Sequence, residues 1–513
     1  MEHAVRSCPQ DSPGARIRTI ARRLPRILAL ALALALALTA PAASQDVPRN
    51  VILILSDDHR YDFMGFMEEA PAFLETPNLD RMAAGGAHLR NAFVTTALCS
   101  PSRASILTGQ YAHRHRIVDN TSPIPAGTVF FPQYLQDAGY ATAYVGKWHM
   151  GETDDAPQPG FDHWVSFRGQ GVYVDPLLNI NGEQRQFEGY TTDVLTEQAL
   201  DWLQSQHTRA ADQPFFMVLS HKAVHAEFIP APRHAGRYGD VEIPYPETMA
   251  NTVSNYRNKP DWVKAQRNSW HGVDFAYHGA LDFDEFYRAY AETLLAMDEG
   301  VGRVLDYLEE SGLDENTLVL YMGDNGFMLG EHGLIDKRNA YEESIRVPML
   351  AWAPGFIEPG DTIDALIRNI DIAPTVLDLF DVQSRHTIDG TSFLELLSGA
   401  RTAAPPSATE LPGEPALLYE YYWEHAFPHT PTTFALRGPR FKYIYYHGVW
   451  DLQELYDLQT DPHERYNLIA VPEYQDEVAT MRAALFERLA ATGGMSIPLK
   501  PAGSWQAAER RLP

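Results

Sequence analysis

Cys99 is the residue whose chemistry stands out first in this chain. There are two cysteines, and Cys8 lies in a leader that we expect to be removed. A single remaining sulfur cannot form an internal disulfide. Cys99 is therefore either a reactive or modified residue or an inert buried side chain. Its flanking sequence, CSPSRASILTG over residues 99–109, favours the chemical role.

Two acidic pairs, Asp57-Asp58 and Asp324-Asn325, each follow a predicted buried strand. If those strands are neighbours, three carboxylates and an amide converge. Each pair of like charges 4 Å apart would then cost about 4 kcal/mol at an effective dielectric constant near 20. A hard cation bound by oxygen ligands would remove that cost, and calcium is favoured over magnesium where few waters are available. Taken alone, each pair is more typical of a tight turn than of a metal site.

The segment 99–109 matches every fixed position of the pattern C-x-P-S-R-x-x-x-L-T-G, and it resembles the signature of the type I sulfatases. The resemblance extends from about residue 50 to about residue 468. In that family the cysteine is oxidised to formylglycine (3-oxoalanine) before folding, and the aldehyde hydrate is the nucleophile. The resemblance therefore implies a formylglycine at Cys99, a maturation enzyme that generates it, and an alkaline-phosphatase-like α/β sandwich.

The resemblance also implies a site built around one calcium ion (Ca2+). Modified Cys99 is then a metal ligand together with the two acidic pairs, Asp57, Asp58, Asp324 and Asn325.

Further roles implied by the resemblance concern the sulfate group and its protons. Arg103 would hold the aldehyde hydrate and a sulfate oxygen, while Lys147 and Lys337 would bind sulfate. His149 would take a proton from the second hydroxyl of the hydrate, and His225 would lie near the leaving oxygen.

The chemistry of an aldehyde hydrate suits sulfuryl transfer. A thiol that attacked sulfur would be consumed as a stable thiosulfate ester. A hydrate can attack with one oxygen and then expel sulfate when its second hydroxyl is deprotonated and the aldehyde re-forms. We expect protonated His225 to donate to the leaving oxygen and neutral His149 to act as the base.

The predicted substrate is a sulfated carbohydrate. Residues 167–173, 179–182 and 421–424 resemble N-acetylglucosamine-6-sulfatases and mucin-desulfating enzymes, which implies 6-O-sulfated N-acetylglucosamine in a glycosaminoglycan, mucin or marine polysaccharide. Lys147, His225, Lys337, Gln170 and His429 are the predicted substrate contacts. The aromatic side chains of residues 419–425 either line a sugar pocket or pack within a small sheet.

Three alternatives stay open at this point. A formylglycine-dependent phosphonate or phosphodiester hydrolase would share the superfold and the nucleophile. A sulfatase acting on another polysaccharide sulfate would share the whole site. A catalytically inactive sugar-binding protein is disfavoured because every position carried over from the family is filled.

Composition narrows the partners. The formal net charge of −26 argues against nucleic acid as a ligand. It also means that a sulfate anion must be held by a local cluster of cations. Hydrophobic residues make up 45% of the chain and the mean hydropathy is −0.28, as in ordinary globular proteins.

Residues 1–44 have a basic start, an apolar run and small residues at the end, which predicts a cleaved signal peptide and a periplasmic or secreted protein. No later segment is apolar for long enough to span a membrane.

The elements that must position these residues alternate between strands and helices. We predict strands over residues 51–55, 141–145, 215–220 and 318–322, and helices that include 102–109, 192–206 and 286–310. Alternation of this kind indicates an α/β fold with a large, mostly parallel sheet flanked by helices. The polar candidates follow the strands, at the edge where such sheets place their sites.

A second, smaller unit is predicted beyond a proline-rich segment. We assign residues 45–400 to a catalytic domain, 401–416 to a linker and 417–513 to a C-terminal α+β subdomain. Predicted strands over 417–423, 434–436 and 441–446 and a helix over 473–492 give a small antiparallel sheet with one helix.

Overall fold

A ten-stranded sheet forms the centre of the computed structural model, which describes residues 47–151, 154–275, 282–400, 416–448 and 452–498. Its strands, in spatial order, are β12 (Asp361–Arg368), β2 (Ala87–Phe93), β11 (Met349–Trp352), β8 (Thr317–Gly323), β1 (Asn50–Ser56), β7 (Phe215–Ser220), β3 (Ala141–Lys147), β4 (His163–Phe167), β5 (Leu177–Ile180) and β6 (Glu183–Gln186). The block from β8 to β4 is parallel throughout, as is the β12–β2 pair. Strand β11 is antiparallel to both neighbours, and β5 and β6 add an antiparallel edge.

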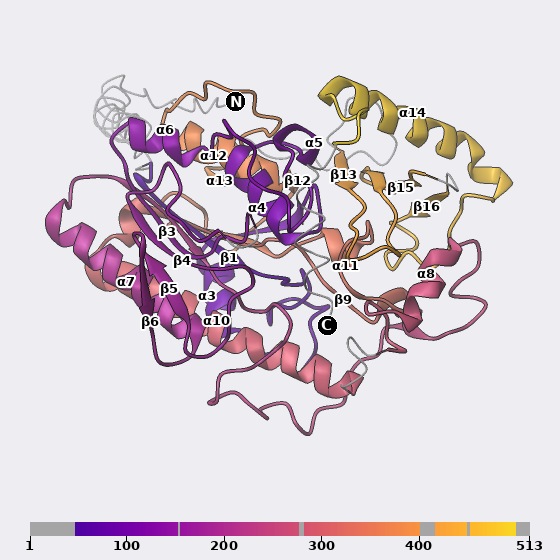
Figure 1. Cartoon of the computed structure of the whole chain (residues 1–513), viewed down its shortest axis with the longest axis horizontal. Helices are drawn as coiled ribbons and strands as arrows, with labels where there is room; N and C mark the ends of the chain where they lie inside the picture. The colour runs from indigo at the N-terminus through magenta and orange to yellow at the C-terminus, as the bar shows by residue number, and fades with distance from the viewer. Residues whose placement is uncertain (1–46, 152–153, 276–281, 401–415, 449–451, 499–513) are drawn as a thin grey trace, which may run out of the picture. The chain divides into compact units, whose positions relative to one another are not determined.

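Helices cover both faces of this sheet (Figure 1). Strand β1 shows why, because its side chains alternate between two cores: Val51 and Leu53 face one, and Ile52 and Ile54 face the other. The first core includes α4 (Cys99–Thr108), α6 (Pro132–Asp137) and α12 (Ile372–Leu379), and the second includes α3 (Pro77–Gly85), α7 (Thr191–Arg209) and α10 (Phe283–Ser311). A strand buried on both faces is apolar along its length, as observed for residues 51–55 of β1.

A four-stranded antiparallel sheet carries the C-terminal segment. Its strands are β13 (Leu417–Tyr421), β14 (Thr433–Arg437), β15 (Phe441–Tyr446) and β16 (Gln453–Asp457), paired in chain order. Helix α14 (Gln475–Thr492) packs Met481, Leu485 and Leu489 against it. The remaining short elements are α5 (Ala112–His115), α8 (Asp261–Ala265), α11 (Glu342–Ile345), α13 (Leu394–Leu397), β9 (Met328–Leu329) and β10 (Ile335–Asp336). Residues from Val47 onward form one compact unit.

The predicted fold class is confirmed: a mostly parallel sheet between helices, with a small antiparallel sheet and one helix. The helix predicted to begin at Ser102 starts three residues earlier, at Cys99. Pro101 does not prevent this, because the first turn of a helix has no intrahelical partner for its N–H groups. The first such bond runs from the Ser102 N–H to the Leu98 carbonyl, at 2.9 Å. The helix ends as predicted, at Gly109 in the left-handed region.

Other predicted features lie outside the described residues or differ at their ends. The signal peptide and most of the linker fall in segments that the structure does not describe. Strand β13 ends at Tyr421 and not at Trp423, and α14 begins at Gln475 and not at Glu473. No helix among the described residues combines the length and apolar character needed to cross a bilayer.

Candidate active site

Two adjacent parallel strands bring the acidic pairs together. β1 and β8 pair in register, with Ser56 opposite Gly323, so the residues that follow them leave the sheet at the same edge. Carboxylate oxygens of Asp57, Asp58 and Asp324 lie within 4.8 Å of one another, and all three side chains are buried. The Asp58 N–H donates to Asp324 Oδ1 at 3.1 Å, which joins the two strand ends directly.

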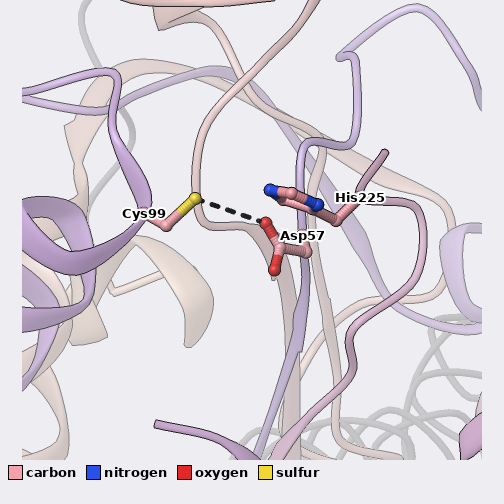
Figure 2. A group of neighbouring side chains, drawn as sticks. All are labelled: Asp57, Cys99 and His225. Carbon is pink, nitrogen blue, oxygen red and sulfur yellow. Dashed lines mark hydrogen bonds between the residues drawn. The ribbon is translucent and has the colours of Figure 1, made fainter. Parts of the chain in front are cut away.

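Cys99 contacts this cluster from a helix, as the first residue of α4. Its Sγ lies 3.6 Å from Asp57 Oδ1 and is fully buried. Figure 2 shows Cys99, Asp57 and the imidazole of His225 grouped together, and ligand atoms of these three residues lie within 4.8 Å of one another. Burial raises the pKa of the Cys99 thiol to about 12, so the unmodified side chain is a neutral thiol and a weak nucleophile at neutral pH.

Three cations surround the carboxylates. Arg103, one helical turn after Cys99, donates from Nε to Asp324 Oδ2 at 2.9 Å, and its Nη2 forms an ion pair with the same oxygen at 2.7 Å. Lys147, at the end of β3, pairs with Asp57 Oδ2, and Lys337 pairs with Asp58 Oδ1. Through these contacts, six predicted site residues, three carboxylates and three cations, form one buried cluster.

The pKa values of the carboxylates follow from this arrangement. Burial alone would raise the pKa of Asp57, but Lys147 and the other nearby cations hold it well below its ordinary value. Burial raises the pKa of Asp58 to about 7 despite Lys337, with further contributions from Asp57 and Asp324. Burial also raises the pKa of Asp324. The three carboxylates therefore lie close together in a buried site from which water is excluded. A bound cation would favour their ionised forms.

Two orphaned oxygen atoms test whether the residues fit a metal ion. Asp58 Oδ2 and Asn325 Oδ1 are buried and have no hydrogen-bond partner among the described residues. The Asn325 amide nitrogen donates to Asp58 Oδ1 at 2.7 Å and to the Gly326 carbonyl at 2.8 Å, which leaves its oxygen available as a ligand. An all-oxygen donor set with unsatisfied oxygens fits a hard divalent cation such as calcium.

The two histidines differ in their contacts. His225 Nε2 is 3.9 Å from Asp58 Oδ2. His149 has a left-handed backbone (φ 62°), and its carbonyl accepts from Ser100 Oγ at 3.0 Å. Its Nδ1 is buried and has no hydrogen-bond partner in the described part of the chain. Burial lowers the pKa of both imidazoles well below the ordinary value, and Lys147 lowers each further. Both rings are therefore neutral in this structure, whereas we expected His225 to be protonated.

The predicted substrate contacts separate into two places. Gln170 lies in the cluster, where its Oε1 accepts from Lys147 Nζ at 2.5 Å. His429 does not: it is exposed and lines a cavity of about 940 Å³ with Lys259 and Trp262. Among the aromatic side chains of residues 419–425, Tyr419, Tyr421 and Tyr422 are at most 2% exposed, so the packing alternative holds for these three.

Several supporting residues were not anticipated. The Ser220 hydroxyl accepts from Arg103 Nη1 at 2.5 Å and donates to the Lys147 carbonyl at 2.9 Å. The Tyr173 hydroxyl donates to the His225 carbonyl at 2.5 Å. Ser220 ends β7, so the strand-end rule that identified the acidic pairs could have found it. Tyr173 comes from a loop, and its spacing carries no such signal.

Replacement of Arg103 by methionine is expected to lower the free energy of unfolding by about 3–5 kcal/mol, because it leaves buried acceptors and a carboxylate without their partner. Urea unfolding of the purified variant measures this. Arg185→Met is the matched control, since the Arg185 side chain is 59% exposed and lies 3.1 Å from its partner Glu183, which is 75% exposed. A surface pair of this kind is worth less than about 1 kcal/mol. Equal, small changes in the two variants would contradict the structural role of Arg103.

Comparison with known proteins assigns this architecture. The sulfatase family model matches residues 49–382, and a second model, N-sulphoglucosamine sulphohydrolase C-terminal, matches residues 330–491. An N-acetylglucosamine-6-O-sulfatase of Bacteroides thetaiotaomicron is 33% identical over 479 residues, covering 83% of each chain.

Two solved structures add to this. One protein, solved in complex with its substrate D-glucosamine-2-N,6-O-disulfate, is 31% identical with a TM-score of 0.77 and covers 88% of this chain and 100% of its own. A phosphonate monoester hydrolase of Silicibacter pomeroyi shares the fold, with a TM-score of 0.71 at 23% identity, covering 86% of this chain and 95% of its own. The family models span the described fold and the bacterial relative covers most of the chain, and from these matches it follows that the protein belongs to the sulfatase family and is a sulfuric ester hydrolase.

Proposed function

We propose that this sulfatase removes the 6-O-sulfate of N-acetylglucosamine units in a sulfated glycan, using a formylglycine made from Cys99 and one calcium ion. The observation that carries the proposal is the contact of Cys99 with a carboxylate cluster that is itself ringed by Arg103, Lys147 and Lys337. Its relative from Bacteroides thetaiotaomicron, named for activity on N-acetylglucosamine-6-O-sulfate, supports the substrate.

The oxygen-rich cluster would hold the calcium ion through Asp57, Asp58, Asp324 and Asn325, with the side chain of residue 99 as a further ligand. When bound, the ion draws charge from the sulfate group and lowers the pKa of a coordinated hydroxyl. The formylglycine hydrate supplies the oxygen nucleophile that a buried thiol with a raised pKa does not.

The cations of the cluster orient and stabilise the sulfate. Arg103 is fixed by three hydrogen bonds, to Asp324, the Lys147 carbonyl and Ser220, and by an ion pair with Asp324, so its guanidinium does not reorganise during the reaction. Lys147 and Lys337 lie beside the carboxylates and carry the charge opposite to that of the transferred group. Preorganised positive groups in a buried site are typically worth 10²–10³-fold each in rate.

The two histidines move protons. Neutral His149 is ready to accept a proton, in agreement with its lowered pKa. His225 must gain a proton before it can donate to the leaving oxygen. Its pKa is lowered by burial and by Lys147, and a sulfate ester arriving nearby brings the negative charge that raises the pKa again.

Release of inorganic sulfate from N-acetylglucosamine-6-sulfate by the matured enzyme tests the proposal. We expect hydrolysis of this ester and of 4-nitrophenyl sulfate, with at most weak hydrolysis of 4-nitrophenyl phosphate and phosphonate. The fold alone does not make this distinction, because a phosphonate monoester hydrolase shares it. Faster cleavage of the phosphonate would favour the alternative activity, and cleavage only of other sugar sulfates would move the substrate to another polysaccharide.

The remaining assignments concern export and maturation. We propose that residues 1–44 direct secretion to the periplasm or the medium, that 401–416 link a catalytic domain over 45–400 to a subdomain over 417–513, and that a formylglycine-generating enzyme is a transient partner. The leader composition and the match of residues 99–109 to the modification signature support this.

Calcium should stabilise the protein more strongly as pH rises. Native Asp58 has a pKa of about 7 against an ordinary value of 3.8. The metal-free native state therefore holds an extra proton between these values, and its free energy of unfolding falls as pH rises through that window. A bound cation needs the carboxylate, so its affinity should fall about tenfold per pH unit below about 7. The increase in Tm on adding calcium to chelator-stripped protein should thus be larger at about pH 8 than at about pH 5.5. An equal increase at both values would contradict the assignment of Asp58.

A further inference from the structure

A cavity of about 400 Å³ lies beside the catalytic cluster. Gln170 connects the two, because it lines the cavity and its Oε1 accepts from Lys147 Nζ at 2.5 Å. The volume of this cavity lies in the range of pockets that hold a small ligand. The group that carries the sulfate must extend out of the cluster, and Gln170 shows that this cavity adjoins it.

Lys222 is the buried cation of this cavity. The residue is 4% exposed, and its ammonium lies 4.6 Å from the centre of the Tyr173 ring. Within the described segments no residue accepts a hydrogen bond from Lys222 or forms an ion pair with it. Burial lowers its pKa to about 8, and Lys147 adds to that effect, as expected for an ammonium without a counterion of its own. A buried charge of this kind is expensive unless a ligand pairs with it.

Tyr173 links this lysine to the chemistry. Its hydroxyl donates to the His225 carbonyl at 2.5 Å, and its ring stacks on Tyr190 with centroids 5.8 Å apart. One rigid side chain thus supports both the ammonium of the cavity and the histidine expected at the leaving oxygen. Tyr173 therefore places Lys222 and His225 close to each other.

The rest of the cavity wall suits a sugar. Trp270 and Val172 are 45% and 52% exposed and present apolar surface at the wall. Aromatic and aliphatic faces of this kind pack against the C–H faces of a pyranose. Glu227 also lines the cavity, but it is exposed and forms no ion pair with Lys222 among the described residues. The buried charge at the inner end is therefore positive.

We propose that Lys222 binds a second anionic group on the substrate, distinct from the sulfate that is removed. The chemistry is that of a sulfamate, a sulfate ester or a carboxylate on the glucosamine itself or on the next sugar, with the pyranose against Trp270. This rests on the proposed function, because it requires that the cleaved ester is part of a glycan. The preferred substrate is then a multiply charged glycan, and Lys222 sets that preference without taking part in sulfuryl transfer.

Kinetic comparison of substrates with and without the second anion tests the role of Lys222. The probes are 4-nitrophenyl sulfate, N-acetylglucosamine-6-sulfate, glucosamine-2-N,6-O-disulfate, and a 6-O-sulfated N-acetylglucosamine joined to a uronic acid. Lys222→Met keeps the apolar stem and removes the charge. We expect it to lower kcat/KM by about 10–100-fold for whichever probe carries the recognised anion. For 4-nitrophenyl sulfate and the monosulfated sugar, kcat/KM should stay within about threefold.

Two further variants complete the design. Lys222→Arg should retain a large part of the preference, because it preserves the charge. Lys264→Met is the matched control, since Lys264 is an exposed lysine whose ammonium lies 5.6 Å from the Tyr256 ring centre. It should leave all four substrates unchanged. Thermal unfolding of each variant verifies that the comparison is made on folded protein.

These measurements distinguish a failure of the inference on Lys222 from a failure of the proposed function. A selective loss on the disulfate alone places the second anion on the glucosamine, and a selective loss on the uronic acid probe places it on the neighbour. Equal losses on all probes would assign Lys222 to the transferred sulfate, and no loss on any would remove it from recognition; either result overturns the inference. If the unaltered enzyme cleaves 4-nitrophenyl sulfate and none of the sugars, the proposed function itself fails, and the inference fails with it.

Discussion

Replacement of Cys99 by alanine is expected to reduce sulfate ester hydrolysis by at least about 10⁴-fold, the scale seen when a covalent nucleophile is removed. The carboxylates and cations around it remain in place, but none of them can form and release a sulfate ester at this position. The fold should survive, because the change removes one buried sulfur atom next to Asp57 and disturbs no backbone hydrogen bond of α4. A loss of about 1 kcal/mol in the free energy of unfolding is the expected cost of the small cavity.

Ser105→Ala is the matched control for this substitution. Ser105 is buried in the same helix, and its hydroxyl lies 3.0 Å from His115 Nε2, away from the carboxylate cluster. It should retain activity with a similar change in stability. Intact mass of the unaltered protein tests the modification itself, since formylglycine is roughly 18 Da lighter than cysteine and its hydrate nearly isobaric with it. Full hydrolysis by purified Cys99→Ala protein would contradict the role of this residue.

Much of the candidate site was predictable because strand ends carry it. Apolar runs buried on both faces identify β1 and β8, and a parallel sheet places their following residues at one edge. That rule brings Asp57, Asp58 and Asp324 together on the condition that β1 and β8 are neighbours, and the structure shows that they are. The helix that carries Cys99 ends where it was predicted to end but begins three residues earlier than predicted. The earlier start is possible because a proline at the third position is compatible with the first turn of a helix.

Several of the strands that the sequence analysis missed lack a continuous apolar run. β12 is an edge strand, and its exposed residues are Asp361, Thr362 and Asp364, so the first half of its sequence is typical of a polar loop. β2 carries His88 and Arg90 among its apolar residues for a related reason: only part of it is buried. Tertiary pairing decides such segments, and local pattern does not reveal it.

The positions of loop residues are the other feature that the sequence does not predict. Gln170 was identified through its resemblance to a known segment, yet its position depends on Gly169 and Gly171, which have φ values of 55° and 66°. Positive φ at both glycines turns the loop back over Lys147. Lys222 lies two residues beyond a predicted strand, but nothing in its spacing shows that its ammonium is buried against Tyr173. Such placements depend on packing between segments far apart in the sequence.

Asp324→Asn is expected to weaken calcium binding by about 10³-fold and to lower sulfatase activity by a similar factor. The substitution keeps the size of the side chain and an oxygen for the Asp58 N–H, but it removes one of three carboxylate charges. A unit charge 4 Å from another contributes about 4 kcal/mol at an effective dielectric constant near 20, which corresponds to about 10³ in affinity. Calorimetric titration of chelator-stripped protein with calcium measures the binding directly, without reference to activity.

Two opposing effects determine the stability of the metal-free Asp324→Asn variant. Arg103 loses the charge of the carboxylate that it contacts at 2.7 and 2.9 Å, which destabilises the fold. At the same time Asp58 loses a like-charged neighbour that raises its pKa, which relieves repulsion within the cluster. The change in Tm without calcium should therefore be modest, whereas the increase in Tm on adding calcium should largely disappear. Asp364→Asn, an exposed carboxylate paired with Arg90, should alter neither quantity. A normal calcium-dependent increase in Tm for Asp324→Asn would mean that Asp324 serves to orient Arg103 and not to bind the ion.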